Sequence, residues 1–346
     1  MLSITDRQFQ IIEVIKNAKT ASFRDVMAIL ATYSERTLKR ELSDLVNMGV
    51  LIMSGGGRSV VYTVTVLGRL SVPIIGETYA VPEPESRLGA LQNYQFGLWQ
   101  HFPTKLFSDS IYREFETLTT IYQESLRTQS ADIRKRELER FIIELSWKSS
   151  RIEGNTYTFL DTERLLREGV SSSMNSVEET QMILNHKEAF DFVISSPLDN
   201  GKLTQAYIES LHTHLMRDLL VDMDWRRSGV GITGSTYHPL DNQFQIVEAL
   251  DDLLQAIERM ATVYDKALLC LCGISYIQPF VDGNKRTARL LANALLLSGM
   301  AAPLSYRSID EVHYRSALLA FYEQLSIMPM QKIFTEQYEF AAKNYH

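Results

Sequence analysis

Cysteine is scarce in this sequence, and the scarcity argues against a disulfide-stabilised scaffold. The 346 residues include only Cys270 and Cys272, which stand in the apolar stretch ALLCLCGISYI. Alternate positions on a helix do not bridge easily, and a C-x-C pair alone is not a metal site. We expect both to be buried structural thiols in a reducing compartment.

Long apolar segments are lacking as well. The uncharged run from Leu290 to Leu304 is too short to span a bilayer, and it contains Asn293, Gly299 and Pro303. The N-terminal stretch MLSITDRQFQII has polar residues throughout and shows no secretory signal. We therefore expect a cytoplasmic protein with no membrane partner.

No strong excess of one charge is present. The net charge is −7, but residues 1–70 carry nine Lys or Arg against six Asp or Glu. This small positive balance is a mild indication that the N-terminal segment meets something anionic.

The N-terminal 72 residues have the pattern of three helices and a hairpin. Thr5, Ser22 and Ser34 stand where N-caps are expected, and the third helix should stop at Gly49. The stretch LIMSGGGRSVVYTVT then has two β-branched runs around a glycine turn. This arrangement resembles a winged helix-turn-helix.

In that resemblance the third helix would be the recognition helix, and duplex DNA would be a candidate partner. The candidate contacts are Arg36, Thr37, Lys39 and Arg40 on the helix, with Arg58 on the wing. Winged helices also mediate protein contacts or dimerise, so a protein partner and a homodimer stay open.

A linker with three prolines and no helical period is expected over residues 73–87. From residue 88 to 346 the pattern is almost wholly helical, so we expect a mainly α fold. The exception is the Gly-, Ser- and Thr-rich stretch from Val230 to Asp241, which should be an extended flap.

Two short motifs in this region do not indicate ligand sites. GVGITG matches G-x-G-x-x-G, but no strand is expected before it and STYHPLDN after it cannot open a helix. His212 and His214 form an H-x-H pair without an acidic third ligand at helical spacing. We expect one packed and one exposed histidine there.

The stretch YIQPFVDGNKRTARLL is suited to hold an anion. Asp282, Gly283 and Asn284 form a turn at the expected start of a helix, where free amides and the helix dipole favour negative charge. Arg286 and Arg289 project on one side of the first turn and suit a polyphosphate, for which Asp282 would hold Mg²⁺. The alternative is an ordinary charged helix start, and composition alone does not separate the two.

This stretch resembles the Fic family signature, H-x-F-x-[DE]-G-N-[GK]-R-x-x-R, at residues 278–289. WKSSRIEGNTYT resembles the family's inhibitory motif, [ST]-x-x-x-E-[GN], at Ser149, Glu153 and Gly154. GVGITGSTYHP, preceded by Arg226, resembles the family's flap at about residues 229–240. The resemblance implies an all-helical core with a short β flap.

The resemblance also implies an activity, the transfer of AMP from ATP to a hydroxyl of an unidentified target protein, with Mg²⁺. Glu153 would pair with Arg289 and block the γ-phosphate. Asp282 would hold the metal. The ATP and phosphate contacts would be Gly283, Asn284, Lys285, Arg286 and Arg289, and the target-binding flap residues would be Gly231, Ile232, Thr233, Gly234 and Ser235.

Two positions depart from the family pattern. The catalytic histidine, which acts as general base, falls at Gln278, and glutamine has no titratable group. Lys285 stands where many members have glycine, and Asn-Lys-Arg also occurs in the related Doc kinases, which transfer phosphate. We therefore expect ancestral AMP transfer that is impaired, with a non-catalytic ATP sensor and a DNA-binding regulator as the alternatives.

Overall fold

The computed structural model describes residues 4–345, and the chain divides into two compact units. The first unit comprises the chain up to Pro103 together with residues 231–238 and 316–329. The second unit comprises residues 104–230, 239–315 and the chain from Met330 onward. The limits predicted for the N-terminal domain and the linker fall within the first unit.

The first unit begins with three helices at the predicted places. α1 (Asp6–Asn17), α2 (Phe23–Ile29) and α3 (Glu35–Asn47) start after Thr5, Ser22 and Ser34, and each of these side chains accepts a hydrogen bond from a backbone N–H of the first turn. Gly49 has a φ of +72°, a left-handed conformation that suits glycine just beyond a helix end. The three predicted caps are therefore confirmed.

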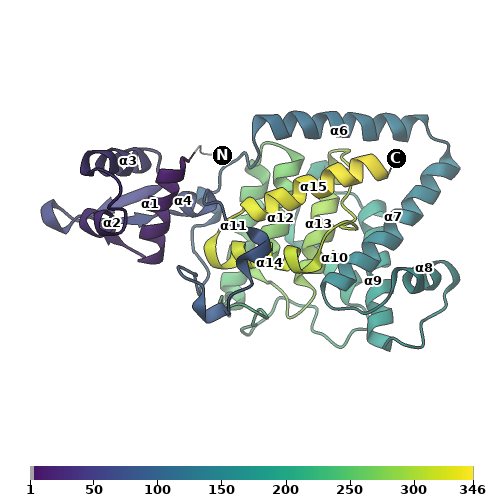
Figure 1. Ribbon diagram of the computed structural model, residues 1–346. Coiled ribbons are helices and arrows are strands. Elements are labelled where there is room, and N and C mark those ends of the chain that lie inside the picture. Colours follow the sequence, from purple (N-terminus) through teal and green to yellow (C-terminus); the bar gives the residue numbers. More distant parts are fainter. Residues whose placement is uncertain (1–3, 346) are drawn as a thin grey trace. The chain divides into compact units, whose positions relative to one another are not determined.

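A small antiparallel sheet completes this part of the unit (Figure 1). The predicted hairpin is β2 (Leu51–Ser54) and β3 (Val61–Val64), joined through a 3₁₀ turn, η1 (Gly57–Ser59). A third strand, β1 (Ala21–Ser22), pairs with β3 and was not predicted. Apolar side chains of the helices and strands, among them Ile12, Leu38 and Val64, form one core.

The stretch predicted as a linker without helix contains short helical turns. These are α5 (Gly76–Tyr79) and η2 (Pro84–Ser86), while α4 (Val66–Leu70) lies before the stretch and η3 (Trp99–His101) after it. A single helical turn is too short to produce a hydrophobic period, so the sequence pattern could not indicate α5.

The second unit is built from helices, most of which start at a Ser, Thr or Asn cap. They are α6 (Asp109–Thr128), α7 (Ala131–Ile152), α8 (Phe159–Glu168), α9 (Val177–Ser195), η4 (Asp199–Gly201), α10 (Gln205–Met216), α11 (Gln243–Arg259), α12 (Val263–Ile277) and α13 (Asn284–Ser298). The chain closes with α14 (Glu311–Gln324) and α15 (Met328–Asn344).

Helix α13 is the centre of this unit. It contacts α12, α10, α9 and α7, and Figure 1 shows α12 and α13 side by side. Nearly all of its first thirteen side chains are buried, including the polar Arg286, Thr287 and Asn293. Because polar groups at such positions need partners, the start of α13 is the natural place to look for a site.

The two cysteines and the H-x-H pair lie in this unit. Cys270 and Cys272 are fully buried free thiols on α12, as predicted, and burial raises the pKa of both. His212 is buried, and His214 is half-buried. No helix among residues 4–345 is both long enough and apolar enough to cross a membrane.

Candidate functional site

The segment between α12 and α13 is a tight loop with two left-handed residues. Gln278 ends α12 with a φ of 52°, and Gly283 precedes α13 with a φ of 78°. A Cβ on Gly283 would lie 2.7 Å from Met216 Sδ and 3.1 Å from His212 Cε1, so glycine is required for space as well as conformation. Unlike α6 to α12, α13 receives no side-chain cap, which leaves its N-terminal amides to other partners.

Asn284 ties this loop together through both ends of its amide. Its Nδ2 donates to Gln278 Oε1 at 3.0 Å and to Phe280 O at 2.8 Å, and its Oδ1 accepts from Phe280 N at 2.9 Å. The Gln278 side chain in turn donates to Ser275 O at 2.6 Å. The amide at position 278 is therefore part of the loop's own hydrogen-bond network.

Aromatic rings pack against the loop at Phe280. The His212 ring lies parallel to it with centroids 3.4 Å apart, and Trp225 stacks at 4.7 Å. His212 Nδ1 is 3.2 Å from Thr287 Oγ1 on α13. This packing explains why His212 is buried beneath the loop.

Arg226 braces the loop from outside the signature. It is buried, its Nη2 donates to Ile277 O at 3.2 Å, and its Nε donates to Gln278 O. Its backbone N–H donates to Pro279 O at 3.0 Å. Three consecutive carbonyls of the loop are thus held by one residue.

Arg286 is buried with donors to spare. Its Nη2 donates to Asp282 Oδ2 at 2.8 Å, but Nε and Nη1 have no hydrogen-bond partner among the described residues. The Asp282 side chain is 60% exposed, so its carboxylate faces solvent. Buried guanidinium donors without partners are costly, and an anion at this place would satisfy them.

Each nitrogen of the Arg289 guanidinium donates a hydrogen bond to the end of α7. Its Nε donates to Ser149 Oγ and its Nη2 to Ser149 O, both at 2.8 Å, while its Nη1 donates to Glu153 Oε1 at 2.9 Å. Lys285 Nζ lies 2.9 Å from the other oxygen, Glu153 Oε2. Gly154, with a φ of 100°, turns the chain away immediately after Glu153.

Opposite charges keep Glu153 ionised. Burial acts to raise the pKa of its carboxyl, but the charges of Arg289 and Lys285 outweigh burial and bring the pKa to about 2. Its side chain is 16% exposed and that of Arg289 is fully buried. The structure thus brings together the signature residues and the predicted inhibitory motif, which lie more than 120 residues apart in sequence.

The predicted flap is an irregular segment. Residues 231–238 belong to the first unit, and within them a turn is closed by Ser235 N donating to Ile232 O at 3.1 Å. No strand is formed between residues 229 and 240, and the β pairing there is a single parallel bridge between Asn93 and His238. The segment is thus irregular, with β pairing only at His238, and the extended flap stays a prediction.

The candidate DNA contacts on α3 are exposed to solvent. Arg36, Lys39 and Arg40 all lie on the outer face, although Lys39 pairs with Glu35 at 2.6 Å and Arg40 with Glu41 at 3.2 Å. The side chain of Arg58 lies outside the described part of the structure. DNA contact stays a prediction.

Sequence reasoning did not place Arg226, His212 or Met216 against the signature loop, although all three lie beside it. Their partners are backbone carbonyls, a ring and a glycine that come from other elements, so no local spacing pattern marks them. Lys285 was expected to contact phosphate, whereas its amine lies on Glu153.

Comparisons with known proteins place part of this chain among Fic proteins. A sequence model of the Fic/DOC family matches residues 202–296. A protein adenylyltransferase Fic of Drosophila erecta is 26% identical over 184 residues, which is 52% of this chain and 37% of the relative. The counterpart of Drosophila melanogaster is 28% identical over 162 residues, 46% of this chain and 33% of the relative. The chain spans about a third of the length of these relatives.

Solved structures show the same fold. A Fic domain containing signaling protein of Bacteroides thetaiotaomicron superposes with a TM-score of 0.57 at 22% identity, covering 66% of this chain and 95% of that one. A Fic family protein of Desulfovibrio desulfuricans gives 0.58 at 19% identity, covering 70% and 76%.

The helical part of the chain has the fold of these Fic proteins, and in it the uncapped start of α13 faces a carboxylate from the end of α7. The chain carries a Fic/DOC family domain, with the matched region centred on α10 to α13.

Proposed function

We propose that this chain is a Fic-type adenylyltransferase scaffold that binds Mg-ATP at the start of α13 and is restrained at Glu153 and Gln278. The engagement of Arg289 by Glu153 carries the proposal. Every nitrogen of the Arg289 guanidinium already donates to Ser149 or Glu153, so an outer phosphate has to compete with the Glu153 carboxylate for this side chain.

The residues at the start of α13 suit a magnesium nucleotide. The partnerless Nε and Nη1 of Arg286 and the uncapped helix start offer donors to phosphate oxygens. No cluster of three or more His, Cys, Asp or Glu in the described chain could hold a metal alone. Asp282 would therefore hold Mg²⁺ together with phosphate oxygens and water, and the bound cation would offset phosphate charge.

Glu153 would restrain activity by hindering the γ-phosphate of ATP from pairing with Arg289. Ionised Glu153 is held by Arg289 and Lys285, so a γ-phosphate has to displace a carboxylate before it can pair with Arg289. Removing the carboxylate frees a buried guanidinium and a partly exposed ammonium for the nucleotide. We expect ATP to bind more tightly, or in a different pose, when the Glu153 carboxylate is removed.

The restraint at Gln278 concerns the proton of the attacking hydroxyl. The Gln278 amide already donates to Ser275 O and accepts from Asn284, and it has no proton-accepting nitrogen. A general base contributes about 10²- to 10⁴-fold, so transfer by this chain should be slower by that order.

Labelled nucleotides test the proposal. The chain, Gln278→His, and Gln278→His with Glu153→Gly would be incubated with Mg²⁺ and either α-labelled or γ-labelled ATP. We expect label from the α position only, strongest in the double variant, including self-modification. The matched control is Gln278→Ala with Glu153→Gly, which has no base and should stay unlabelled. Label from γ-ATP would instead indicate phosphoryl transfer of the Doc type.

A non-catalytic ATP sensor is the second candidate, and the absence of a base at Gln278 favours it. In that case calorimetry would detect Mg-ATP binding while no variant transfers label. The exposed Arg36, Lys39 and Arg40 leave room for a DNA partner, and salt-dependent duplex binding that is lost in Arg36→Ala/Arg40→Ala would identify it. The proposal also includes an unidentified target protein, a homodimer of this chain and a cytoplasmic location.

A further inference from the structure

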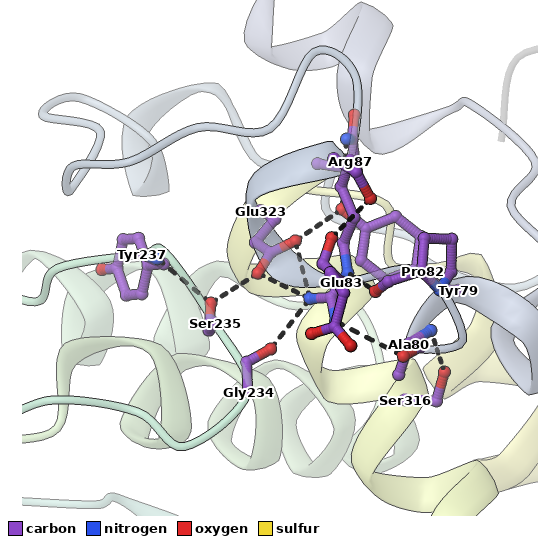
Figure 2. A network of polar contacts seen from close by, with 12 residues as sticks. Tyr79, Ala80, Pro82, Glu83, Arg87, Gly234, Ser235, Tyr237, Ser316 and Glu323 are labelled. Carbon is purple, nitrogen blue, oxygen red and sulfur yellow. Dashed lines mark hydrogen bonds and ion pairs between the residues drawn. The ribbon is translucent and has the colours of Figure 1, made fainter.

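A second buried ion pair lies in the first unit, apart from the signature residues. The side chain of Glu323, on α14, is fully buried, and that of Arg87 is 4% exposed. Arg87 Nη1 lies 3.0 Å from Glu323 Oε1 and 3.2 Å from Oε2. Figure 2 shows that this pair is the centre of a larger polar network.

The network joins three segments that are distant in sequence. From residues 79–87, Arg87 Nε donates to Pro82 O at 3.1 Å and Tyr79 OH donates to Glu323 at 2.8 Å. From the predicted flap, Ser235 Oγ donates to Glu323 Oε1 at 2.6 Å, and Gly234 O accepts from Arg87 Nη1 at 2.9 Å. Each side of the ion pair therefore holds one flap residue (Figure 2).

These contacts hold the turn of the flap, since residues 231–238 form no strand and their backbone pairs only through the single bridge at His238. Ser235 Oγ, besides donating to Glu323, accepts from Tyr237 N at 3.1 Å, and Ser235 N closes the turn to Ile232 O. Gly234, at the turn, has a φ of 77°. A buried carboxylate needs all of its donors, so the network favours one arrangement of Gly234 and Ser235 over others.

We propose that Glu323 and Arg87 are positioning residues that hold residues 231–238 in the conformation that aligns a target polypeptide. The inference rests on the proposed function, in which this segment binds the target. Both residues act through Gly234 and Ser235, so they should affect target engagement and leave nucleotide affinity unchanged. Extended recognition segments bind through their main chain, and an ordered main chain lowers the entropic cost of that binding.

Hydrogen exchange in the full-length chain tests the positioning without needing transfer. Ser235→Ala removes the flap's link to Glu323 and leaves the ion pair in place, so it should fold normally. We expect exchange of the amides in 231–238 to rise about tenfold in Ser235→Ala and in Glu323→Gln, while the Kd for Mg-ATP changes less than about twofold. The matched control is Glu311→Gln, which removes an ion pair with Lys148 from the same helix and should leave this exchange unchanged.

A kinetic split tests the link to function. In the Gln278→His/Glu153→Gly background, Ser235→Ala should slow self-labelling from α-labelled ATP about tenfold, with the half-saturating ATP concentration unchanged. Unchanged exchange over 231–238 in both variants overturns the positioning role, even where labelling succeeds. Faster exchange with no labelling in any background supports the positioning and counts against the transferase proposal instead.

Discussion

Lys285 Nζ lies 2.9 Å from Glu153 Oε2, the carboxylate oxygen that Arg289 does not hold. Each oxygen of Glu153 therefore has its own cation, one fully buried and one partly exposed. The lysine stands at a signature position where many family members have glycine. Its location makes Lys285 a second holder of the carboxylate in addition to Arg289.

A double-mutant cycle separates the two roles of Lys285. Lys285→Met removes one of the cations that hold Glu153, and because the pair is partly exposed we expect Mg-ATP to bind about two- to fivefold more tightly. Glu153→Gly should tighten binding about tenfold or more, since it releases charge-assisted hydrogen bonds. Calorimetry measures both. In the Glu153→Gly background, Lys285→Met should be neutral or weaken binding, and continued tightening there would contradict the model of competition.

Gly283→Ala should damage both stability and nucleotide binding. The residue has a φ of 78°, and its new Cβ would meet Met216 Sδ at 2.7 Å, so we expect a loss of about 1–3 kcal/mol in the free energy of unfolding. Urea unfolding and calorimetry with Mg-ATP measure the two effects. Gly231→Ala is the control, because a Cβ there meets nothing within 4 Å and its φ is not positive. Equal behaviour of the two variants would contradict the account of the loop.

Arg226→Met should loosen the signature loop. Ile277 O and Gln278 O lose their side-chain donor, whereas the backbone N–H at position 226 still donates to Pro279 O, and buried carbonyls left without partners cost about 1–3 kcal/mol each in the free energy of unfolding. We expect weaker Mg-ATP binding together with a lower urea midpoint. The neighbouring Arg227, with a side chain 73% exposed, provides the control, and Arg227→Met should change neither quantity.

Acid should destabilise the fold through two buried histidines. Burial, aided by the charges of nearby arginines, lowers the pKa of His186 and of His212 to about 3. The unfolded chain, with a histidine pKa of about 6.5, then binds more protons than the folded chain. The contribution of these histidines to the free energy of unfolding is fully present above about pH 6.5. It falls as the pH drops toward 3, by up to about 1.4 kcal/mol per pH unit for each histidine.

Urea unfolding at several pH values between about 7 and 5 measures this slope. His186 has no hydrogen-bond partner in the described chain, so His186→Gln should reduce the slope by about half. His214→Gln, at a half-buried position stacked on Phe192, should leave the slope unchanged. A slope that is the same in all three proteins would exclude buried histidine as the cause.

Local features of the fold were predictable, and tertiary features were not. The caps at Thr5, Ser22 and Ser34 were predicted because a cap involves only the next three residues. The strand β1 was not, since two residues pair with a strand forty positions later and carry no pattern of their own.

In the candidate site, too, local features were predictable and tertiary contacts were not. The signature itself was readable because its residues share one loop and one helix start. The location of Lys285 on Glu153 depends on how α7 packs against α13, and the support from Arg226 depends on a loop that follows α10. Neither relationship has a sequence spacing that could reveal it.

The network around Glu323 limits where this chain can be cut when its N-terminal domain is exchanged for another. A helical fragment cut at residue 88 would keep Glu323 but lose both Tyr79 and Arg87, and would leave a buried negative charge without its cation. A chimaera that joins another N-terminal domain to the helical part should therefore keep residues 79–87 of this chain together with its helical part. By this criterion the natural junction for recombination lies before α5.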